Sequence, residues 1–267
     1  MTNKAKVGDI ELAYTSKGEG DLLILIGGFS MVKEMWERQV ADLSQHFRVI
    51  AFDNRGVGES TITEPDFTIA DMAADVVGLM DYLQIDKTHV FGVSMGGLIS
   101  QMLALDHWDR IRKVALGCTS HGGRFAVAPD AEVMALLAKM GDPSMPVEEG
   151  IRLRLPIMYS ERFIREEPEK IEKIVALFIR YQPTVKGAQG QMKALSFFNV
   201  KKRLGEIRCP ILAITGDEDR MMPPDNAQLI VEGIPGAGLY IVKGAGHAFY
   251  YEKPYEVNRV LTAFFQK

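Results

Sequence analysis

Residues 92–97 read GVSMGG, and this stretch predicts a strand that turns sharply into a helix. It follows an apolar run typical of a buried strand, residues 90–93, and it precedes a pattern with helical spacing. Gly92 and Gly96 suit such a turn, because neither adds a β-carbon where the backbone approaches its neighbours closely. The turn would hold the Ser94 hydroxyl out from the end of a sheet. We therefore predict that Ser94 is a nucleophile rather than a helix-capping serine.

Apolar runs typical of strands alternate with amphipathic helical patterns on both sides of this stretch. The predicted strands cover residues 10–15, 22–26, 47–52, 90–93, 111–116, 211–215 and 239–242. The predicted helices between them cover residues 32–43, 68–83, 225–233 and 254–265. This alternation predicts an α/β fold, with a mostly parallel sheet and helices on both of its faces.

The alternation stops between residues 121 and 200. Helical patterns follow one another there, over residues 131–140, 147–158, 168–181 and 187–198. Strand patterns return after residue 200, and we find no linker on either side. We therefore predict one core domain, residues 1–120 and 201–267, interrupted by a helical cap, residues 121–200.

Composition and charge narrow the class of protein. The 267 residues are 47% hydrophobic and 25% charged, as in ordinary globular proteins. The net charge is −4, which argues against nucleic acid or an anionic membrane as the main partner. The sequence shows neither a signal-peptide pattern nor an apolar stretch long enough to span a bilayer. These features predict a cytoplasmic protein with no membrane insertion, and they leave a homodimer open.

The two cysteines do not form a recognisable motif. Cys118 and Cys209 lack a CxxC or Cys/His spacing and stand beside apolar strand-like runs. We expect free, buried thiols, and we expect neither a metal nor a cofactor.

A serine nucleophile needs a base, and five histidines are available. His247 lies in a glycine-rich loop directly after the predicted strand 239–242, where it can reach over the end of the sheet. His121 is the rival, because it also follows a predicted strand. For the others we expect structural or surface roles: His46, His89 and His107.

The base in turn needs an acid that orients it. Residues 216–220 read GDEDR and follow the predicted strand 211–215, so three carboxylates crowd one strand end. We select Asp219, and we expect Asp217 to cap the turn through its own backbone and Glu218 to face solvent. The segment after strand 111–116 has no carboxylate, which favours Asp219 further.

The order Ser94, Asp219, His247 is the order found in α/β-hydrolases. The chain resembles that superfamily, in particular small capped bacterial esterases and 3-oxoadipate enol-lactonase-like proteins. The segments that carry the resemblance are residues 22–29, 53–60, 92–97, 216–224 and 244–254.

The resemblance implies an oxyanion hole formed by the backbone N–H groups of Phe29 and Met95. In the family a His-Gly pair precedes the first donor, whereas this chain has Gly27-Gly28. We therefore expect the loop to be held less firmly. Arg55, in the family's loop after the next strand, is expected to tie loops together rather than to catalyse.

The resemblance also implies that the cap covers Ser94 as a lid and encloses a mostly apolar pocket. The expected pocket residues are Gly28, Met31, Trp36, Met134 and Met158. Four of the arginines in the cap either form a solvated face or include one that meets a substrate carboxylate: Arg152, Arg154, Arg162 and Arg165.

The activity that the resemblance implies is metal-free hydrolysis of a small-molecule carboxylic ester or lactone through an acyl-enzyme on Ser94. Alternatives are cleavage of a carbon–carbon bond in a vinylogous diketone, and perhydrolase or acyltransferase chemistry. A ligand-binding receptor on the same fold is the non-enzymatic alternative.

Overall fold

The computed structural model describes residues 2–140 and 145–267. In that part of the chain, eight strands form one sheet in the order β1-β2-β4-β3-β5-β6-β7-β8. β2 pairs antiparallel with β1 and with β4, and every other neighbouring pair is parallel. The strands are β1 (Asn3–Val7), β2 (Ile10–Lys17), β3 (Leu22–Ile26), β4 (Arg48–Phe52), β5 (Thr88–Val93), β6 (Ile111–Gly117), β7 (Ile211–Gly216) and β8 (Gly238–Val242).

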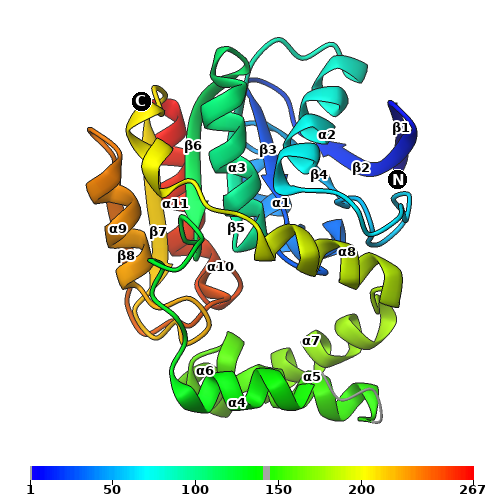
Figure 1. Ribbon diagram of the computed structural model, residues 1–267, viewed down its shortest axis with the longest axis vertical. Coiled ribbons are helices and arrows are strands. Elements are labelled where there is room, and N and C mark those ends of the chain that lie inside the picture. The colour runs from blue at the N-terminus through cyan, green and yellow to red at the C-terminus, as the bar shows by residue number, and fades with distance from the viewer. Residues whose placement is uncertain (1, 141–144) are drawn as a thin grey trace.

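Helices cover both faces of the sheet, as predicted (Figure 1). One face carries α2 (Ile69–Tyr82), α3 (Met95–Asp106) and α9 (Asp225–Gly233). The opposite face carries α1 (Glu37–Leu43) and α11 (Pro254–Gln266). β3 shows why its sequence is apolar throughout: Ile24 packs toward the first group of helices, and Leu25 packs toward the second.

Residues 121–200, here called the insert, contribute five helices to the described structure. These are α4 (Ala131–Met140), α5 (Val147–Met158), α6 (Glu161–Glu166), α7 (Pro168–Arg180) and α8 (Val185–Ser196). The two ends of the insert lie side by side. Gly122 forms a β-bridge with Asn199, and the Val200 N–H donates to the His121 carbonyl at 2.9 Å. Figure 1 shows α4 to α7 gathered at one end of the molecule and α8 between them and the sheet layer.

The structure differs from the predicted elements where segments are short. The predicted helix 32–43 divides into a 3-10 turn, Lys33–Trp36, followed by α1. The turn forms because the Lys33 N–H donates to Asp53 Oδ1 at 2.7 Å, which ties this segment to the loop after β4. The sequence did not predict β1, α6 or α10 (Phe249–Glu252). Throughout the described part of the chain, each helix is too short or too polar to cross a bilayer.

Candidate active site

Ser94 occupies the sharp turn between β5 and α3. Its backbone has φ +53° and ψ −118°, a conformation that costs energy for any residue with a β-carbon. The Ser94 N–H donates to the Gly117 carbonyl at 2.8 Å, and the Ser94 carbonyl accepts from Thr119 Oγ1 at 2.8 Å. A β-carbon on Gly96 would lie 2.1 Å from the Ile26 carbonyl oxygen, so only glycine fits there. The local sequence therefore forces the turn that presents Ser94.

His247 and Asp219 form a buried pair at the ends of neighbouring strands. His247 follows β8 and Asp219 follows β7, and each is only 4% exposed. His247 Nδ1 lies 2.9 Å from Asp219 Oδ2 and 3.0 Å from Oδ1, and Oδ1 also accepts the Met222 N–H at 2.8 Å. This arrangement holds the imidazole with Nδ1 toward the acid and leaves Nε2 for another partner. Within the described residues, no hydrogen bond joins Ser94 Oγ to His247.

The surroundings of His247 alter its protonation. Burial by itself would lower the pKa of His247, but the Asp219 carboxylate outweighs burial, and the pKa lies above the usual 6.5. Burial raises the pKa of Cys118, so this thiol stays protonated at neutral pH. Both cysteines are free, Cys118 buried and Cys209 partly exposed.

Cys118, Asp219 and His247 are also the types of side chain that bind metal ions. One potential ligand atom from each lies within 4.8 Å of the others, in the part of the chain that the structure describes. The imidazole and the carboxylate are hydrogen-bonded directly to one another, however, and a metal would have to break that bond. The geometry therefore fits an acid–base pair better than a set of metal ligands.

The loop after β3 runs beside Ser94. A β-carbon on Gly28 would lie 3.2 Å from Ser94 Cβ and 3.8 Å from Ser94 Oγ. The Gly28 carbonyl accepts the Met31 N–H at 3.2 Å, so in a trans peptide the Phe29 N–H points the opposite way. Among the described residues, neither the Phe29 N–H nor the Met95 N–H donates a hydrogen bond. These two free donors are the ones expected for an oxyanion hole.

Hydrogen bonds from other segments hold this loop. Asn54 Nδ2 donates to the Gly27 carbonyl at 3.0 Å, and Asp53 accepts the Lys33 N–H at 2.7 Å. Gln191 Oε1, which comes from the insert, accepts the Ser30 N–H at 2.9 Å. Side chains from two other segments thus support the loop that contains Gly27 and Gly28.

The rival candidates for the base and the acid are not part of the hydrogen-bonded pair of His247 and Asp219. His121 is buried at the base of the insert, with Nδ1 2.8 Å from the Gly122 carbonyl oxygen. Asp217 accepts the Gly244 N–H at 2.6 Å, so it steadies the loop of His247 instead of capping its own turn. Glu218 is exposed, as expected.

Burial also accounts for a further histidine. His89 is buried beside the rings of Phe47 and Phe265, and desolvation lowers its pKa to about 4. It is therefore a neutral core residue at physiological pH.

The expected pocket residues occupy different surroundings. Trp36 is fully buried and packs against Phe91 and Tyr250, so it is a core side chain in this structure. Met31 is buried near the Tyr250 hydroxyl, which lies 3.7 Å from its sulfur. Met134 is 51% exposed on α4, so its side chain is not enclosed in a pocket.

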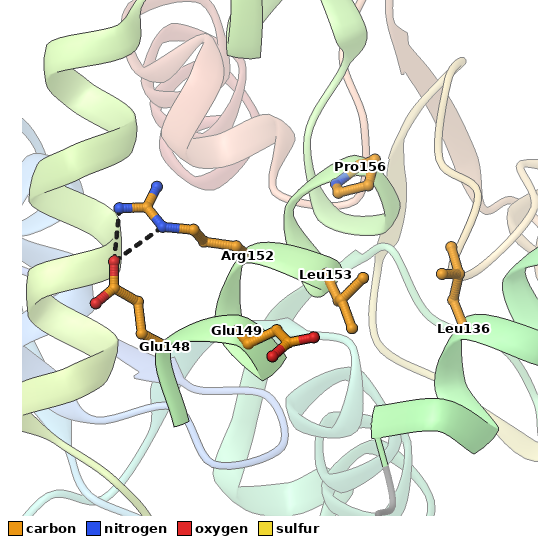
Figure 2. A pocket seen from close by; sticks show the side chains of 6 residues that line it. All are labelled: Leu136, Glu148, Glu149, Arg152, Leu153 and Pro156. Atoms are coloured by element: carbon orange, nitrogen blue, oxygen red, sulfur yellow. Dashed lines mark hydrogen bonds and ion pairs between the residues drawn. The ribbon is translucent and has the colours of Figure 1, made fainter. Parts of the chain in front are cut away.

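A cavity of about 490 Å³ opens between α4 and α5 (Figure 2). Its lining consists of Leu136, Glu148, Glu149, Arg152, Leu153 and Pro156, and includes none of the three residues Ser94, Asp219 and His247. This cavity belongs to the outer part of the insert and not to the candidate active site.

Of the four cap arginines singled out from the sequence, three pair with carboxylates. Arg152 pairs with Glu148 and Glu172, and both Arg162 and Arg165 pair with Glu166. Arg154 has no carboxylate partner among the described residues. Burial lowers its pKa, and its guanidinium lies 5.8 Å from the centre of the Phe178 ring.

Arg55 behaves as the sequence suggested. Its guanidinium makes two hydrogen bonds of 2.5 Å to the Asp75 carboxylate of α2, so it ties the loop after β4 to that helix.

Glu252, which was not expected from the sequence, joins the insert to the loop of His247. Glu252 Oε1 accepts the Gly246 N–H at 2.8 Å and the Ser160 N–H at 3.2 Å, and Oε2 accepts the Ser160 hydroxyl at 2.6 Å. Close by, the Ala248 N–H donates to the Met158 carbonyl at 2.8 Å. Nothing in the local sequence indicates that a glutamate at the end of a short helix has partners on two loops.

Comparison with known proteins adds the family. A family model described as alpha/beta hydrolase fold matches residues 21–254. The "Putative carbamate hydrolase RutD" of Azorhizobium caulinodans is 28% identical over 259 residues, covering 96% of each chain. The 3-oxoadipate enol-lactonase 2 of Acinetobacter baylyi is 28% identical over 261 residues, covering 97% of this chain and 94% of the relative.

A solved structure of similar shape is the enol-lactonase from Burkholderia xenovorans LB400. It superposes with a TM-score of 0.87 at 28% identity, covering 99% of this chain and 100% of that one. The names of these relatives specify different bonds, a carbamate and an enol-lactone, so the comparisons identify the family and the general class of reaction.

Proposed function

The chain belongs to the alpha/beta hydrolase fold family, and from this premise we propose that it is a serine hydrolase of carboxylic esters or lactones. The observation that carries the proposal is the buried pair of His247 and Asp219 at the same end of the sheet as the strained turn of Ser94. The family includes relatives named for other hydrolysed bonds, so the ester or lactone specificity is the part that needs testing.

The proposed reaction has two halves. Ser94 Oγ attacks the substrate carbonyl carbon while His247 Nε2 accepts the hydroxyl proton, and the electron pair of the C=O bond moves onto oxygen. The N–H groups of Phe29 and Met95 stabilise that oxyanion. The tetrahedral intermediate then collapses, and the alcohol leaves with the proton from His247. Water, deprotonated by His247, attacks the acyl-enzyme and releases the carboxylic acid and free Ser94.

Asp219 fixes the tautomer in which Nδ1 carries the hydrogen, and it stabilises the imidazolium that forms in each half. The reaction requires Nε2 to come within hydrogen-bond distance of Ser94 Oγ. Such bonds are often long in free enzymes and tighten when substrate binds.

We also propose that the insert, residues 121–200, forms a cap that covers Ser94. Two observations support this division of the chain. The two ends of the insert meet at Gly122 and Asn199, and its Met158 carbonyl contacts the loop of His247.

The test compares the wild-type protein with Ser94→Ala. We expect the wild type to hydrolyse 4-nitrophenyl acetate and to be labelled by a fluorophosphonate probe, and the variant to do neither. Labelling of the variant at the wild-type rate would exclude Ser94 as the nucleophile. Ligand binding without any labelling of the wild type would favour a receptor.

A panel of substrates separates the related reactions. It contains a simple lactone, an aryl carbamate, a ring-fission dienone, and a neutral and a carboxylate-bearing 4-nitrophenyl ester. Fastest turnover of the dienone would favour carbon–carbon bond hydrolysis. The two nitrophenyl esters test whether Arg154, which has no carboxylate partner in the described structure, favours an anionic substrate.

A further inference from the structure

Gln191 joins the insert to two loops of the sheet layer. It lies on α8, and its side chain is fully buried. Its Oε1 accepts the Ser30 N–H at 2.9 Å, and its Nε2 donates to the Arg55 carbonyl at 3.0 Å. Ser30 belongs to the loop after β3 and Arg55 to the loop after β4. One amide of the insert therefore satisfies a backbone donor of one loop and a backbone acceptor of the other.

α8, the helix that carries Gln191, packs closely against the loop after β4. A β-carbon on Gly187 would lie 1.9 Å from the Gly56 carbonyl oxygen, and one on Gly190 would lie 2.5 Å from the Phe67 ring. Glycine inside a helix is unfavourable, and here two glycines allow α8 to approach the loops much closer than side chains would permit. These contacts fix α8 against the loop after β4, and the Gln191 side chain reaches from there to Ser30.

The bond to Ser30 acts on the neighbouring Phe29. Ser30 has φ +57°, a left-handed conformation that costs energy for a residue with a side chain. Gln191 holds the peptide between Phe29 and Ser30 from one side. The bond from the Met31 N–H to the Gly28 carbonyl holds the peptide between Gly28 and Phe29 from the other. The direction of the Phe29 N–H, beside Ser94, depends on both.

We propose that Gln191 is a positioning residue that orients the Phe29 N–H toward the oxyanion of the reaction. The inference rests on the proposed function, because it assigns no chemistry to Gln191 itself. It makes the oxyanion hole dependent on a residue of the insert, so that the insert affects the rate of the chemical step as well as access to the site.

The test removes both hydrogen bonds and keeps the volume. Gln191→Met retains the length of the side chain but can neither accept from Ser30 nor donate to Arg55. The matched control is Ala194→Gly, which weakens α8 one turn away at a buried position and removes no side-chain hydrogen bond. For each protein, kcat and KM for 4-nitrophenyl acetate are measured per active site, with active sites counted by titration with a fluorophosphonate. Inhibition by a trifluoromethyl ketone is measured in parallel, because its hemiketal on Ser94 carries the same oxyanion.

We expect kcat/KM of Gln191→Met to fall about 10- to 100-fold, mostly through kcat, since misdirecting one donor should cost somewhat less than losing it. Affinity for the trifluoromethyl ketone should fall by a similar factor. Ala194→Gly should stay within about twofold of the wild type in both measurements. A purely structural role would reduce the number of active sites and the melting temperature and leave both quantities unchanged per site.

The inference is overturned if Gln191→Met matches the wild type per active site, or if Ala194→Gly lowers both quantities equally. Should Gln191→Met not fold, Gln191→Asn shortens the side chain by one methylene, keeps it polar, and is judged by the same outcomes. If the wild type itself neither hydrolyses the ester nor binds the ketone, the proposed function fails, and this inference fails with it.

Discussion

Two contacts join the insert to the loops around Ser94 and His247, and they are built from different interactions. At α8 the contact is made by glycine backbones and by the neutral amide of Gln191. After α5 the contact is made by the carboxylate of Glu252, which binds Ser160 of the insert and Gly246 in the loop of His247. The first contact reaches the proposed oxyanion loop, and the second reaches the proposed base.

The two contacts differ in the kind of substitution that would disrupt them. Close backbone packing at α8 fixes a distance and leaves no room for one more carbon atom. The Glu252 contact instead depends on a partly buried charge, and burial raises the pKa of this carboxyl. The two contacts should therefore respond to different substitutions, and three predictions follow from the largest effect to the smallest.

The largest effect is expected at the pair of Asp219 and His247, since Glu252 holds the loop that carries His247. Asp219→Asn should lower kcat about 10³- to 10⁴-fold, because the amide cannot fix the reactive tautomer of His247 or stabilise its charged form.

The raised pKa of His247 also predicts the pH dependence. The base must be neutral, so kcat/KM should fall as the pH drops through a value above 6.5.

Removal of the Asp219 charge should lower the pKa of His247 and shift this acid limb to lower pH. Profiles of kcat/KM against pH for both proteins measure the shift. An acid limb that stays in place in Asp219→Asn would contradict the assignment of Asp219 as the partner that raises this pKa.

The next effect is on stability at the Glu252 contact. Glu252→Ala leaves the N–H groups of Gly246 and Ser160 without their acceptor, and bonds to a charged group are stronger than neutral ones. We expect the free energy of unfolding to fall by about 2 to 3 kcal/mol, measured by urea denaturation. Glu256→Ala is the control, since its recorded partner is the hydroxyl of Tyr240, and it should cost about 0.5 kcal/mol. Equal losses of unfolding free energy in the two variants would show that the bonds of Glu252 stabilise the fold no more than those of an ordinary surface glutamate.

The smallest effect contrasts one glycine in α8 with one in α5. Gly187→Ala should destabilise by about 1 to 3 kcal/mol, because its β-carbon would overlap the Gly56 carbonyl oxygen. Gly150→Ala should be neutral or stabilise by up to about 1 kcal/mol, because its nearest neighbour would be Met145 Sδ at an ordinary 3.5 Å. Thermal and urea denaturation of the two variants, side by side, measure the difference. If both substitutions changed the free energy of unfolding in the same direction, the close packing of Gly187 would not distinguish α8 from α5.

Much of the fold follows from periodicity in the sequence. The continuous apolar run at residues 22–26 predicted β3 with its observed bounds, because a strand covered on both faces has no polar side to interrupt the pattern. Residues 32–43 were predicted as one helix, and the break at Trp36 is missed because it arises from the distant Asp53. Short elements such as α10 carry too few residues to show a period.

The candidate site divides in the same way. Ser94, Asp219 and His247 each follow a predicted strand, so their common location at one end of the sheet can be inferred from the sequence. Gln191 and Glu252 act through backbone groups far away in the chain, which leave no local pattern. A signal for α8 did exist, because Gly187 and Gly190 inside a helical pattern indicate a close backbone approach.

The backbone of Ser94 sets stability and activity against each other at a single position. A left-handed serine costs the folded protein on the order of 1 to 3 kcal/mol, and a glycine there would relieve that strain. The same replacement would delete the hydroxyl on which the proposed reaction depends. Selection for stability alone would therefore favour glycine at position 94, and selection for the proposed activity favours serine. The chain has serine there.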